Sequence, residues 1–517
     1  MTMPPPDNSR IQIASRLLEF EEFFTPKYKQ KLVELPAAGM DIYVVSDLHL
    51  AGGLTLSQTY TGTENFFADN DFRRFLDFAH ERLSSRNKRA YLMINGDFID
   101  FLRVADVPKT NVDFARWEDT LRSIGITDKP ASWLQRSISR KEKKFGLKTH
   151  NYKSVWRLGV VLKGHAVVFA ALAQWLDHGH HLAITKGNHD LEWYWPEVRN
   201  FLRLSLAQAI HLLHPRTTLN QCLDRVFNGL TFVDDACVID STIYIEHGHK
   251  YDRIAHVVGG PTLGTNDDEL NLPFGSFFNR YFINRIELAY PFYDNVRPRQ
   301  NILPLLLREH FFYGLKILFA YFPFALRVIP KGYFRYLLKP LTGYLLAFGI
   351  PLALAIVAWG QRIGVWLTSP DSAPHTAQGA IDLLEQKGVG LLKDTGMLFL
   401  TYIFSRIVTH FQLDQPDYLR QWALPIVRKN PGYQCVTMGH THNPEQYDVG
   451  GRWYINSSTW IPVIEADSSA VREDRTYAVV LFERLEKGQL TINPLLRWND
   501  DAGRLEPLDI VTHAEES

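Results

Sequence analysis

The sequence contains five short apolar segments that each end at a cluster of polar side chains, and this pattern constrains the fold more than any other feature. The first segment, residues 42–45 (Ile-Tyr-Val-Val), stops at Ser46 and Asp47. A β-branched run that short, bounded by turn residues, predicts a buried strand. Four further segments have the same form and cover residues 91–94, 181–185, 242–245 and 434–438.

The polar clusters carry side chains that can bind metal ions. Glycine accompanies most of them, which is typical of the turns that end strands. In α/β and sandwich folds, functional residues collect on the loops at one end of the strands, so we expect the five strand ends to converge. The side chains concerned are Asp47, His49, Asp97, Asn188, His189, His247, His440 and His442.

Helical segments alternate with the predicted strands. Residues 72–83 have apolar side chains at helical spacing, and residues 160–177 are also expected to be helical. This alternation predicts a layered α/β core. Residues 477–482 and 490–496 are expected to form a closing hairpin.

The chemistry of the cluster favours a particular kind of metal. The cluster offers carboxylates, imidazoles and one amide but no thiolate, which suits Mn, Fe, Co or Zn and disfavours copper(I). Side chains two residues apart at a strand end, such as Asp47 and His49, can point to the same side. The side chains of this cluster are too many for one tetrahedral ion, but they suit two ions that share a carboxylate. Two ions about 3.5–4 Å apart can clamp both oxygens of an in-line displacement at phosphorus.

The order of these motifs resembles that of the calcineurin-like metallophosphoesterase family. In the family's order, the chain contains Asp47-Leu48-His49, Gly96-Asp97, Gly187-Asn188-His189-Asp190, His247 and Gly439-His440-Thr441-His442. Several motifs in a fixed order are a more specific signal than one short motif. The resemblance implies a dinuclear metallophosphoesterase, a hydrolase that acts on ester bonds.

The resemblance also implies a role for each residue. Asp97 would bridge two divalent metal ions. His189 would act as general acid or stabilise the leaving group, oriented by Asp190, without binding metal. Three side chains would hold each ion: Asp47, His49 and His442 the first, and Asn188, His247 and His440 the second.

The family's core is a β-sandwich flanked by helices, which refines the layered α/β expectation. Two stretches depart from the core pattern: a basic one and a long one rich in aromatic and aliphatic residues. We therefore expect a first core part with a basic insertion, a mostly helical hydrophobic insertion or cap, and a second core part. The expected boundaries are 1–39 for an N-terminal extension, 40–255 for the first part of the core with the basic insertion at 101–155, 256–430 for the hydrophobic insertion, and 431–517 for the C-terminal part of the core.

The hydrophobic insertion raises the question of a membrane. Residues 341–361 contain no charged side chain and approach the roughly 20 residues needed to cross a bilayer. A single crossing would put the motifs before the segment, Asp47 to His247, and those after it, His440 and His442, on opposite sides of the membrane. Because these motifs must meet, either a second crossing exists, with residues 311–326 as the best candidate, or the segment does not cross the membrane. We favour a cap or re-entrant hairpin that dips into the membrane through residues 311–361. The alternatives are a buried helix pair and a two-pass hairpin.

The composition of the chain limits its partners and compartment. The formal net charge is zero, so we expect no nucleic-acid partner. Cys222, Cys237 and Cys435 have no CxxC spacing, which predicts reduced, packed thiols. The N-terminus lacks a basic and then apolar signal sequence. We expect a cytoplasmic protein that associates with the cytoplasmic face of a membrane.

These observations lead to one main hypothesis about function. The chain would hydrolyse a phosphate ester or pyrophosphate through a hydroxide that bridges the two ions, on a phosphorylated small molecule or a lipid-linked, amphiphilic substrate. The alternatives are a protein or nucleotide phosphatase with the insertion as an anchor, and a non-catalytic metal-binding scaffold. Asp100, His249 and Asp252 lie near the motifs and would either support a ligand or have only packing roles.

Overall fold

A computed structural model of the chain has a mixed α/β fold with several β-sheets. Residue contacts divide the chain into two compact units, Met1–Val296 with Gln415–Ser517, and Arg297–Asp414. The structure describes a few positions between 305 and 316 and, outside these, residues 8–24, 26–37, 39–55, 57–264, 266–288, 295–297, 419–465, 472, 475–485, 489–510 and 512–514.

One sheet, which we call sheet I, supplies three of the five predicted strands. Its eight strands have the order β18-β17-β15-β2-β3-β4-β5, and β16 pairs with β15. Strands β2 to β5 are parallel, whereas β15 runs antiparallel to β2. The carboxyl ends of β2, β3 and β4 therefore lie at one edge. The bounds are β2 Asp41–Val45, β3 Ala90–Asn95, β4 His181–Thr185, β5 Leu230–Val233, β15 Ala478–Arg484, β16 Leu490–Ile492, β17 Leu496–Asn499 and β18 Arg504–Pro507.

The second sheet, sheet II, supplies the other two predicted strands. Its seven strands have the order β1-β6-β7-β11-β13-β12-β19. Strands β7 and β11 are parallel neighbours, so their carboxyl ends also lie at one edge. The bounds are β1 Leu32–Leu35, β6 Ala236–Ile239, β7 Ile243–Glu246, β11 Cys435–Met438, β12 Glu445–Asp448, β13 Trp453–Asn456 and β19 Thr512–Ala514. Two-stranded pairs complete the described strands: β8 Thr262–Leu263 with β9 Asn266–Leu270, and β10 Val296–Arg297 with β14 Ile464–Glu465.

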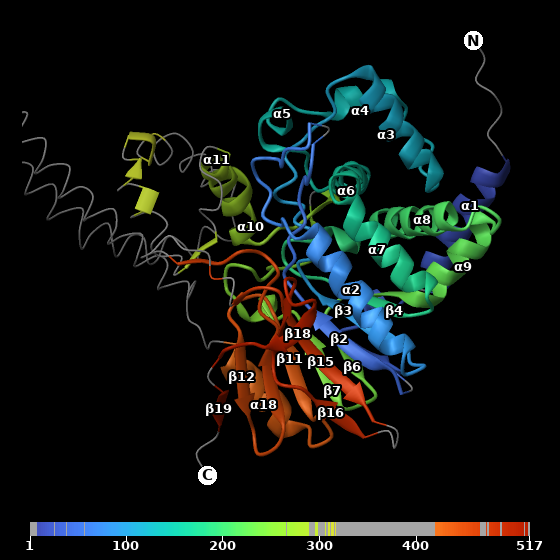
Figure 1. Ribbon diagram of the computed structural model, residues 1–517. Helices are drawn as coiled ribbons and strands as arrows, with labels where there is room; N and C mark the ends of the chain where they lie inside the picture. The colour runs from blue at the N-terminus through green and yellow to red at the C-terminus, as the bar shows by residue number, and fades with distance from the viewer. Residues whose placement is uncertain are drawn as a thin grey trace, which may run out of the picture. The chain divides into compact units, whose positions relative to one another are not determined.

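Strand β2 shows why the predicted strands are apolar throughout. Ile42 and Val44 belong to a buried cluster that strands of both sheets share. Tyr43 and Val45 belong to a larger buried cluster formed with the helices. Because successive side chains of a strand point to opposite faces, a strand buried on both faces needs apolar residues at every position. Figure 1 shows helices α7 and α8 on one side of β2–β4, with β11 and β12 on the other.

The helix predicted over residues 72–83 is confirmed as α2, Asp69–Ser84. Its buried face follows the predicted spacing and includes Phe72, Phe75, Leu76, Ala79 and Leu83. The hairpin predicted at the C-terminal end is also confirmed, because β15 pairs antiparallel with β16.

The helix predicted over residues 160–177 is broken in two. Helix α6, Asn151–Gly164, and helix α7, Ala166–Asp177, are separated by one residue. The two helices differ in direction by 91°. His165 at the break is buried, and its ring nitrogens lie 3.0 Å from Glu64 Oε2 and 2.9 Å from Asp69 Oδ1. These paired contacts fix the bend, because a straight helix would move the imidazole away from both carboxylates.

The remaining helices surround sheet I and connect the strands. Residues of the predicted basic insertion form α3, α4 and α5. The bounds are α1 Asn8–Glu19, α3 Asn111–Ser123, α4 Ala131–Ser137, α5 Glu142–Phe145, α8 Pro196–Leu213, α9 Leu219–Gly229, α10 Phe274–Phe278, α11 Asn284–Glu287 and α18 Arg420–Lys429. Short π and 3-10 turns occupy Phe20–Phe24, Pro26–Lys29, Leu191–Tyr194, His249–Tyr251 and Asn279–Ile283.

The contact-based division places the start of the second unit at Arg297. Part of the segment predicted as insertion therefore belongs to the first unit; for example, Glu269 pairs with Lys148 at 2.8 Å. Among the described residues no single helix has the length and composition to cross a membrane, and the apolar pair α6–α7 is bent. Residues 341–361 and most of 311–326 lie outside the described residues.

Candidate metal centre

Five strand ends bring the predicted metal-binding side chains to one place. Strands β2, β3 and β4 are parallel neighbours in sheet I, and β7 and β11 are parallel neighbours in sheet II. Within each sheet, the residues that follow these neighbouring strands therefore lie at the same edge. The two edges meet where the backbone N–H of His440, after β11, donates to Asp47 Oδ2, after β2, at 3.0 Å.

Asp47, His49 and His442 form the first group of potential ligands. His442 Nε2 lies 3.1 Å from Asp47 Oδ1 and 3.1 Å from His49 Nε2. His49 Nε2 lies 3.8 Å from Asp47 Oδ1. All three side chains are buried, and their ligand atoms are close enough to share one ion.

Asp97, His247 and His440 form a second group. His247 Nε2 lies 3.3 Å from Asp97 Oδ2, and the same oxygen lies 3.7 Å from His49 Nε2. Asp97 thus stands between the two groups, where a bridging ligand must be. Asn188, the remaining predicted ligand, is buried.

The second ring nitrogen of two of these histidines is held by an oxygen acceptor. His247 Nδ1 lies 2.8 Å from the backbone oxygen of Asn95, and His440 Nε2 lies 3.1 Å from Asp252 Oδ2. A proton on the held nitrogen leaves a lone pair on the other, which is the state of a metal-binding imidazole. Asp252 therefore fixes the ring of a predicted ligand, His440. His249 lies behind His247, with ring centroids 5.4 Å apart, and burial and the charge on His247 hold its pKa well below the ordinary value.

The backbone is strained at five of the predicted ligands. A non-glycine residue with positive φ is uncommon and costs roughly 1–3 kcal/mol, so it persists only where the surroundings enforce it, often at functional sites. The strain here turns side chains of alternate residues, such as those of both Asp-x-His and His-x-His motifs, towards one point. The positive values are 54° at Asp47, 51° at His49, 49° at Asp97, 68° at His440 and 56° at His442.

Two motif glycines are required because ligand residues press against them. A Cβ atom on Gly187 would lie 2.1 Å from Asp97 Oδ1, and one on Gly439 would lie 2.6 Å from Asp47 Oδ2. Both distances are far shorter than real Cβ contacts. The glycines recognised in the sequence thus make room for carboxylates contributed by other motifs.

Unpartnered polar atoms in the cluster fit bound cations. Asn188 Oδ1 is buried and has no hydrogen-bond partner among the described residues, while Asp47 Oδ1 and His247 Nε2 are buried and face other predicted ligands, His442 and Asp97. Leaving a buried polar atom unpaired costs about 1–3 kcal/mol. All three atoms are of types that bind divalent ions of the Mn, Fe, Co and Zn group. The residues present therefore fit a dinuclear metal centre.

The charges within the cluster oppose the effect of burial on the pKa values. Burial would lower the pKa of His49, but contacts with Asp100 and Asp47 raise it to about 10. Burial would also lower the pKa of His247, but the charges of Asp97 and Asp47 raise it to about 9. Burial would raise the pKa values of Asp47 and Asp97, but positive charge on His247 holds both below their ordinary range. In the metal-free protein the carboxylates therefore stay ionised and are balanced by protonated imidazoles, whose place a metal ion can take.

His189 differs from the buried ligands in exposure. Its side chain keeps 16% of its surface exposed, against 4% for His49. Its backbone N–H donates to Asp97 Oδ1 at 2.8 Å, and its Nδ1 lies 2.8 Å from Asp100 Oδ2. The position of the His189 side chain fits the predicted role in proton transfer. It also fits a ligand role, because His189, His49 and Asp97 are close enough to hold one ion.

The prediction that Asp190 orients His189 is wrong. The carboxylate of Asp190 accepts the backbone N–H groups of Gly187, at 2.6 Å, and Phe98, at 2.9 Å. These bonds hold the loop after β4 against the loop after β3, so Asp190 fixes the backbone of both loops. Burial and a neighbouring carboxylate raise the pKa of Asp190 to about 7.

Asp100 orients His189 instead. Its Oδ2 lies 2.8 Å from His189 Nδ1, 3.2 Å from His49 Nδ1 and 3.0 Å from Arg103 Nε. Burial would raise the pKa of Asp100, but these cationic neighbours hold it well below the ordinary value. The sequence alone indicates no definite role for Asp100. Its position three residues after Asp97, in the same loop, is the signal that identifies it.

A further group of three histidines has a different character. His80, His178 and His180 lie close enough for a metal ion. However, the backbone N–H of Ala90 donates to His180 Nδ1 at 3.3 Å, so a neutral His180 carries its proton on Nε2, which lies 3.0 Å from His80 Nδ1. Burial and the neighbouring histidines lower the pKa of His180 to about 3, consistent with the neutral form. These hydrogen bonds occupy both nitrogens of His180 without a metal.

No protein-family model matches the chain, and no curated protein matches it. The motifs and their geometry are therefore the grounds on which a function is assigned.

Proposed function

We propose that the chain is a metal-dependent phosphoesterase of the calcineurin-like metallophosphoesterase family that hydrolyses a phosphate ester or pyrophosphate. One observation carries the proposal: side chains from five strand ends meet in one buried cluster. His49 and His442, for example, are 393 residues apart in the sequence, yet their Nε2 atoms are 3.1 Å apart. Packing alone does not explain a cluster of ionised carboxylates and imidazoles on strained backbone, because burying charge is costly unless it is neutralised.

The proposed cofactors are two divalent ions chosen from Mn, Fe, Zn and Co. When bound, they supply Lewis acidity and lower the pKa of the attacking water. Asp97 would be shared between the ions. The other proposed ligands are Asp47, His49, Asn188, His247, His440 and His442.

The remaining residues of the site would position groups and move a proton. Asp100 holds Nδ1 of His189, so the proton available for the departing oxygen is the one on Nε2. The ionised carboxylate of Asp100 also stabilises the positive charge that His189 carries before transfer. Asp252 fixes the ring of His440, and Asp190 fixes the loop that carries His189.

The same proposal extends to the fold and the location. The buried cluster shared by sheets I and II supports a β-sandwich core flanked by helices, as in the proposed family. The uncharged segment 341–361 supports membrane contact through residues 311–361, at the cytoplasmic face, and an amphiphilic or lipid-linked substrate. The large hydrophobic insertion remains part of this proposal.

The test is hydrolysis of p-nitrophenyl phosphate and bis-p-nitrophenyl phosphate by the purified full chain, with and without added Mn²⁺. Wild type is compared with Asp97→Ala, His189→Ala and, as a histidine control outside the cluster, His178→Ala. We expect metal-dependent turnover that Asp97→Ala abolishes and His178→Ala leaves unchanged. His189→Ala should retain metal and lower kcat, by up to about 10²- to 10⁴-fold for poor leaving groups.

The outcome that would overturn the proposal is specific. If the protein binds no divalent metal, or if Asp97→Ala hydrolyses both esters as fast as wild type, the cluster is not the catalytic centre. Loss of activity in His178→Ala as well would show that the substitutions act through folding.

A further inference from the structure

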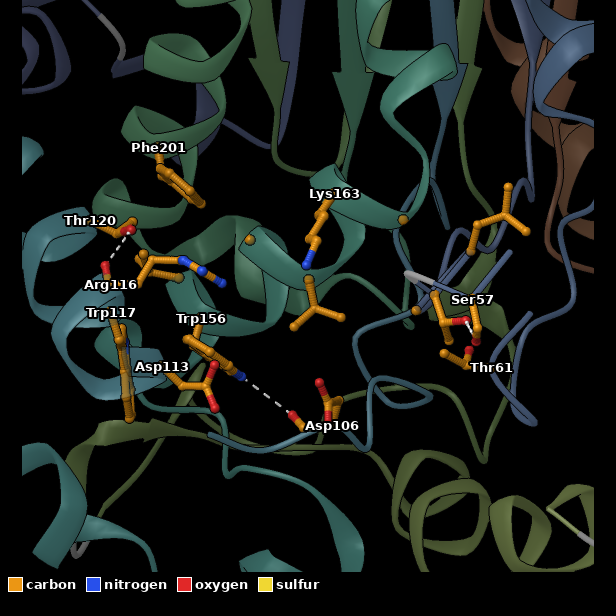
Figure 2. Close-up of a pocket in the computed structure, with 17 residues that line it drawn as sticks. Ser57, Thr61, Asp106, Asp113, Arg116, Trp117, Thr120, Trp156, Lys163 and Phe201 are labelled. Carbon is orange, nitrogen blue, oxygen red and sulfur yellow. Dashed lines mark hydrogen bonds between the residues drawn. The ribbon is translucent and has the colours of Figure 1, made fainter. Parts of the chain in front are cut away.

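A cavity of about 700 Å³ lies beside helix α6, outside the candidate metal centre. Its walls come from the loop that follows β2, from α3, from α6 and from Phe201 of α8. Figure 2 shows Arg116 of α3 and Lys163 of α6 extending their nitrogen atoms into this space. The cavity is large enough for a small organic molecule.

The cavity is lined by two cations, Arg116 and Lys163, and by two carboxylates, so the formal charge of its lining is balanced. Arg116 and Lys163 have no ion-pair partner within 4 Å among the described residues, although two carboxylates also line the cavity. One of these, Asp106, pairs with the exposed Lys109 at 3.3 Å. The other, Asp113, accepts the backbone N–H groups of Thr110 and Lys109 at the start of α3. Burial would raise the pKa of Asp113, but these hydrogen bonds and the charge of Arg116 lower it, so Asp113 stays ionised.

An aromatic surface lies next to these cations. Trp156 and Phe201 line the cavity and are only partly buried. The indole of Trp156 is held in place, since its N–H donates to the backbone oxygen of Asp106 at 3.4 Å and its ring lies 5.7 Å from that of Trp117. A fixed aromatic ring beside two cations that form no close ion pair is suited to an unsaturated or aliphatic group that carries an anion.

The cavity wall is continuous with the metal centre. Gly52 of the wall comes three residues after the predicted ligand His49, so their Cα atoms are at most about 11 Å apart. Glu64 holds this stretch in place by accepting the backbone N–H of Ala51 at 3.3 Å and that of Gly53 at 2.5 Å. Leu50, the residue after His49, donates its backbone N–H to the backbone oxygen of Phe98 at 3.0 Å, next to Asp97. A molecule bound in the cavity would therefore keep a fixed position relative to the metal centre.

We propose that this cavity binds a phosphate group carried on an apolar body, with the phosphate on Arg116 and Lys163 and the apolar part against Trp156 and Phe201. Two separate cations suit the several oxygens of a tetrahedral phosphate, whereas a carboxylate is already satisfied by one arginine. The further assignment of this phosphate to the non-reacting end of the substrate rests on the proposed function. The substrate would then carry two anionic groups, one at the metals and one in the cavity.

The binding test uses phenylphosphonate, which cannot be hydrolysed as a phosphate ester, and a readout confined to the cavity. The full chain is labelled with 5-fluorotryptophan, and Trp156→Phe identifies the ¹⁹F resonance of Trp156 among those of the 12 tryptophans. We expect this resonance to shift saturably with phenylphosphonate and not with benzyl alcohol. The double variant Arg116→Gln/Lys163→Gln should weaken binding more than about tenfold, because it loses charge-assisted contacts. Arg122→Gln, on the same helix outside the cavity, is the matched control.

The result that overturns the binding proposal is a Trp156 resonance that does not respond, or that responds equally to phenylphosphonate in the double variant. Because this readout needs no turnover, it stands whether or not the chain hydrolyses phosphate esters. Conversely, an active enzyme whose Trp156 resonance is unaffected would reject the cavity and leave the proposed function intact.

A second measurement tests the assignment to the substrate. The KM values of α,ω-alkanediol bisphosphates of increasing length are compared with those of the matching alkyl monophosphates, by release of phosphate. If the cavity holds the far end of the substrate, one length of bisphosphate will have a lower KM than its monophosphate, and the double variant will remove the difference. Equal KM values at every length, with the Trp156 shift intact, would assign the cavity to a separate organic phosphate and overturn the substrate assignment.

Discussion

Replacement of Asp100 by asparagine tests how the proposed proton donor is positioned. The carboxylate lies 2.8 Å from His189 Nδ1, and an amide of the same shape keeps an oxygen there but loses the charge. A hydrogen bond to a charged group contributes about 1.5–3 kcal/mol. If that energy is lost only in the transition state, kcat falls by about 10- to 150-fold, at roughly tenfold per 1.36 kcal/mol.

The assay measures kcat for p-nitrophenyl phosphate and phenyl phosphate, with bound metal determined in the same samples. Phenolate is the poorer leaving group and depends more on proton donation, so Asp100→Asn should slow phenyl phosphate more. A merely structural role would slow both esters equally. Asp190→Asn is the comparison, because Asp190 contacts backbone N–H groups and its pKa of about 7 means that a neutral side chain is already partly present there. A larger loss of kcat in Asp190→Asn than in Asp100→Asn would refute the reasoning.

Three other predictions follow from the geometry. Gly187→Ala should abolish metal binding, since its Cβ would lie 2.1 Å from Asp97 Oδ1, an oxygen of a proposed ligand. Gly264→Ala is the control and should bind metal normally, because the space around Gly264 is open. Metal analysis of both variants tests this prediction. Metal uptake at pH 7.5 should release protons from His49 and His247, because their pKa values are raised to about 10 and 9. Calorimetry in buffers of different ionisation enthalpy measures the number of protons released per chain. Metal binding without any proton release would contradict the proposed charges on these histidines. Glu21→Gln should lower the free energy of unfolding by about 3–5 kcal/mol in denaturant titrations, because the buried Arg199 and Arg203 lose their shared carboxylate. A change below about 1 kcal/mol would show that water or other groups replace the carboxylate.

The raised histidine pKa values also predict how the metal-free protein responds to pH. A folded-state pKa raised above the ordinary 6.5 gives stability that is complete below about pH 6.5 and is lost as the pH rises through about 9 to 10. Bound metal replaces the protons on His49 and His247, so this alkaline loss should shrink in the metal-loaded protein. His165, with a pKa raised to about 9 between Glu64 and Asp69, lies outside the centre and should contribute an alkaline loss in both states.

The sequence predicted the strands and the residues at their ends because both signals are local. Residues 42–45 are apolar at every position, and this pattern identifies a strand that is buried on both faces wherever it lies in the fold. The metal-binding residues could be recognised for the same reason, since each group follows directly after such a strand. Their convergence depends on parallel neighbours sharing an edge within each sheet and on the edges of the two sheets meeting, as at Asp47 and His440.

Features that depend on contacts between distant segments were missed or assigned wrongly. The break between α6 and α7 depends on Glu64 and Asp69 reaching His165, and periodicity within residues 160–177 carries no information about those carboxylates. The wrong partner was chosen for His189 because Asp190 is its neighbour in the sequence. Asp100 reaches it only because the loops after β3 and β4 lie side by side.

The most direct test of a dinuclear centre is the binding of Mn²⁺ to the purified full chain, followed by metal analysis and electron paramagnetic resonance. We expect two ions per chain and the multiline spectrum of two coupled Mn²⁺ ions, with the coupling lost in Asp97→Asn because the shared carboxylate is weakened. A single uncoupled ion, or no ion above the level bound by a chelator-treated control, would contradict a dinuclear centre.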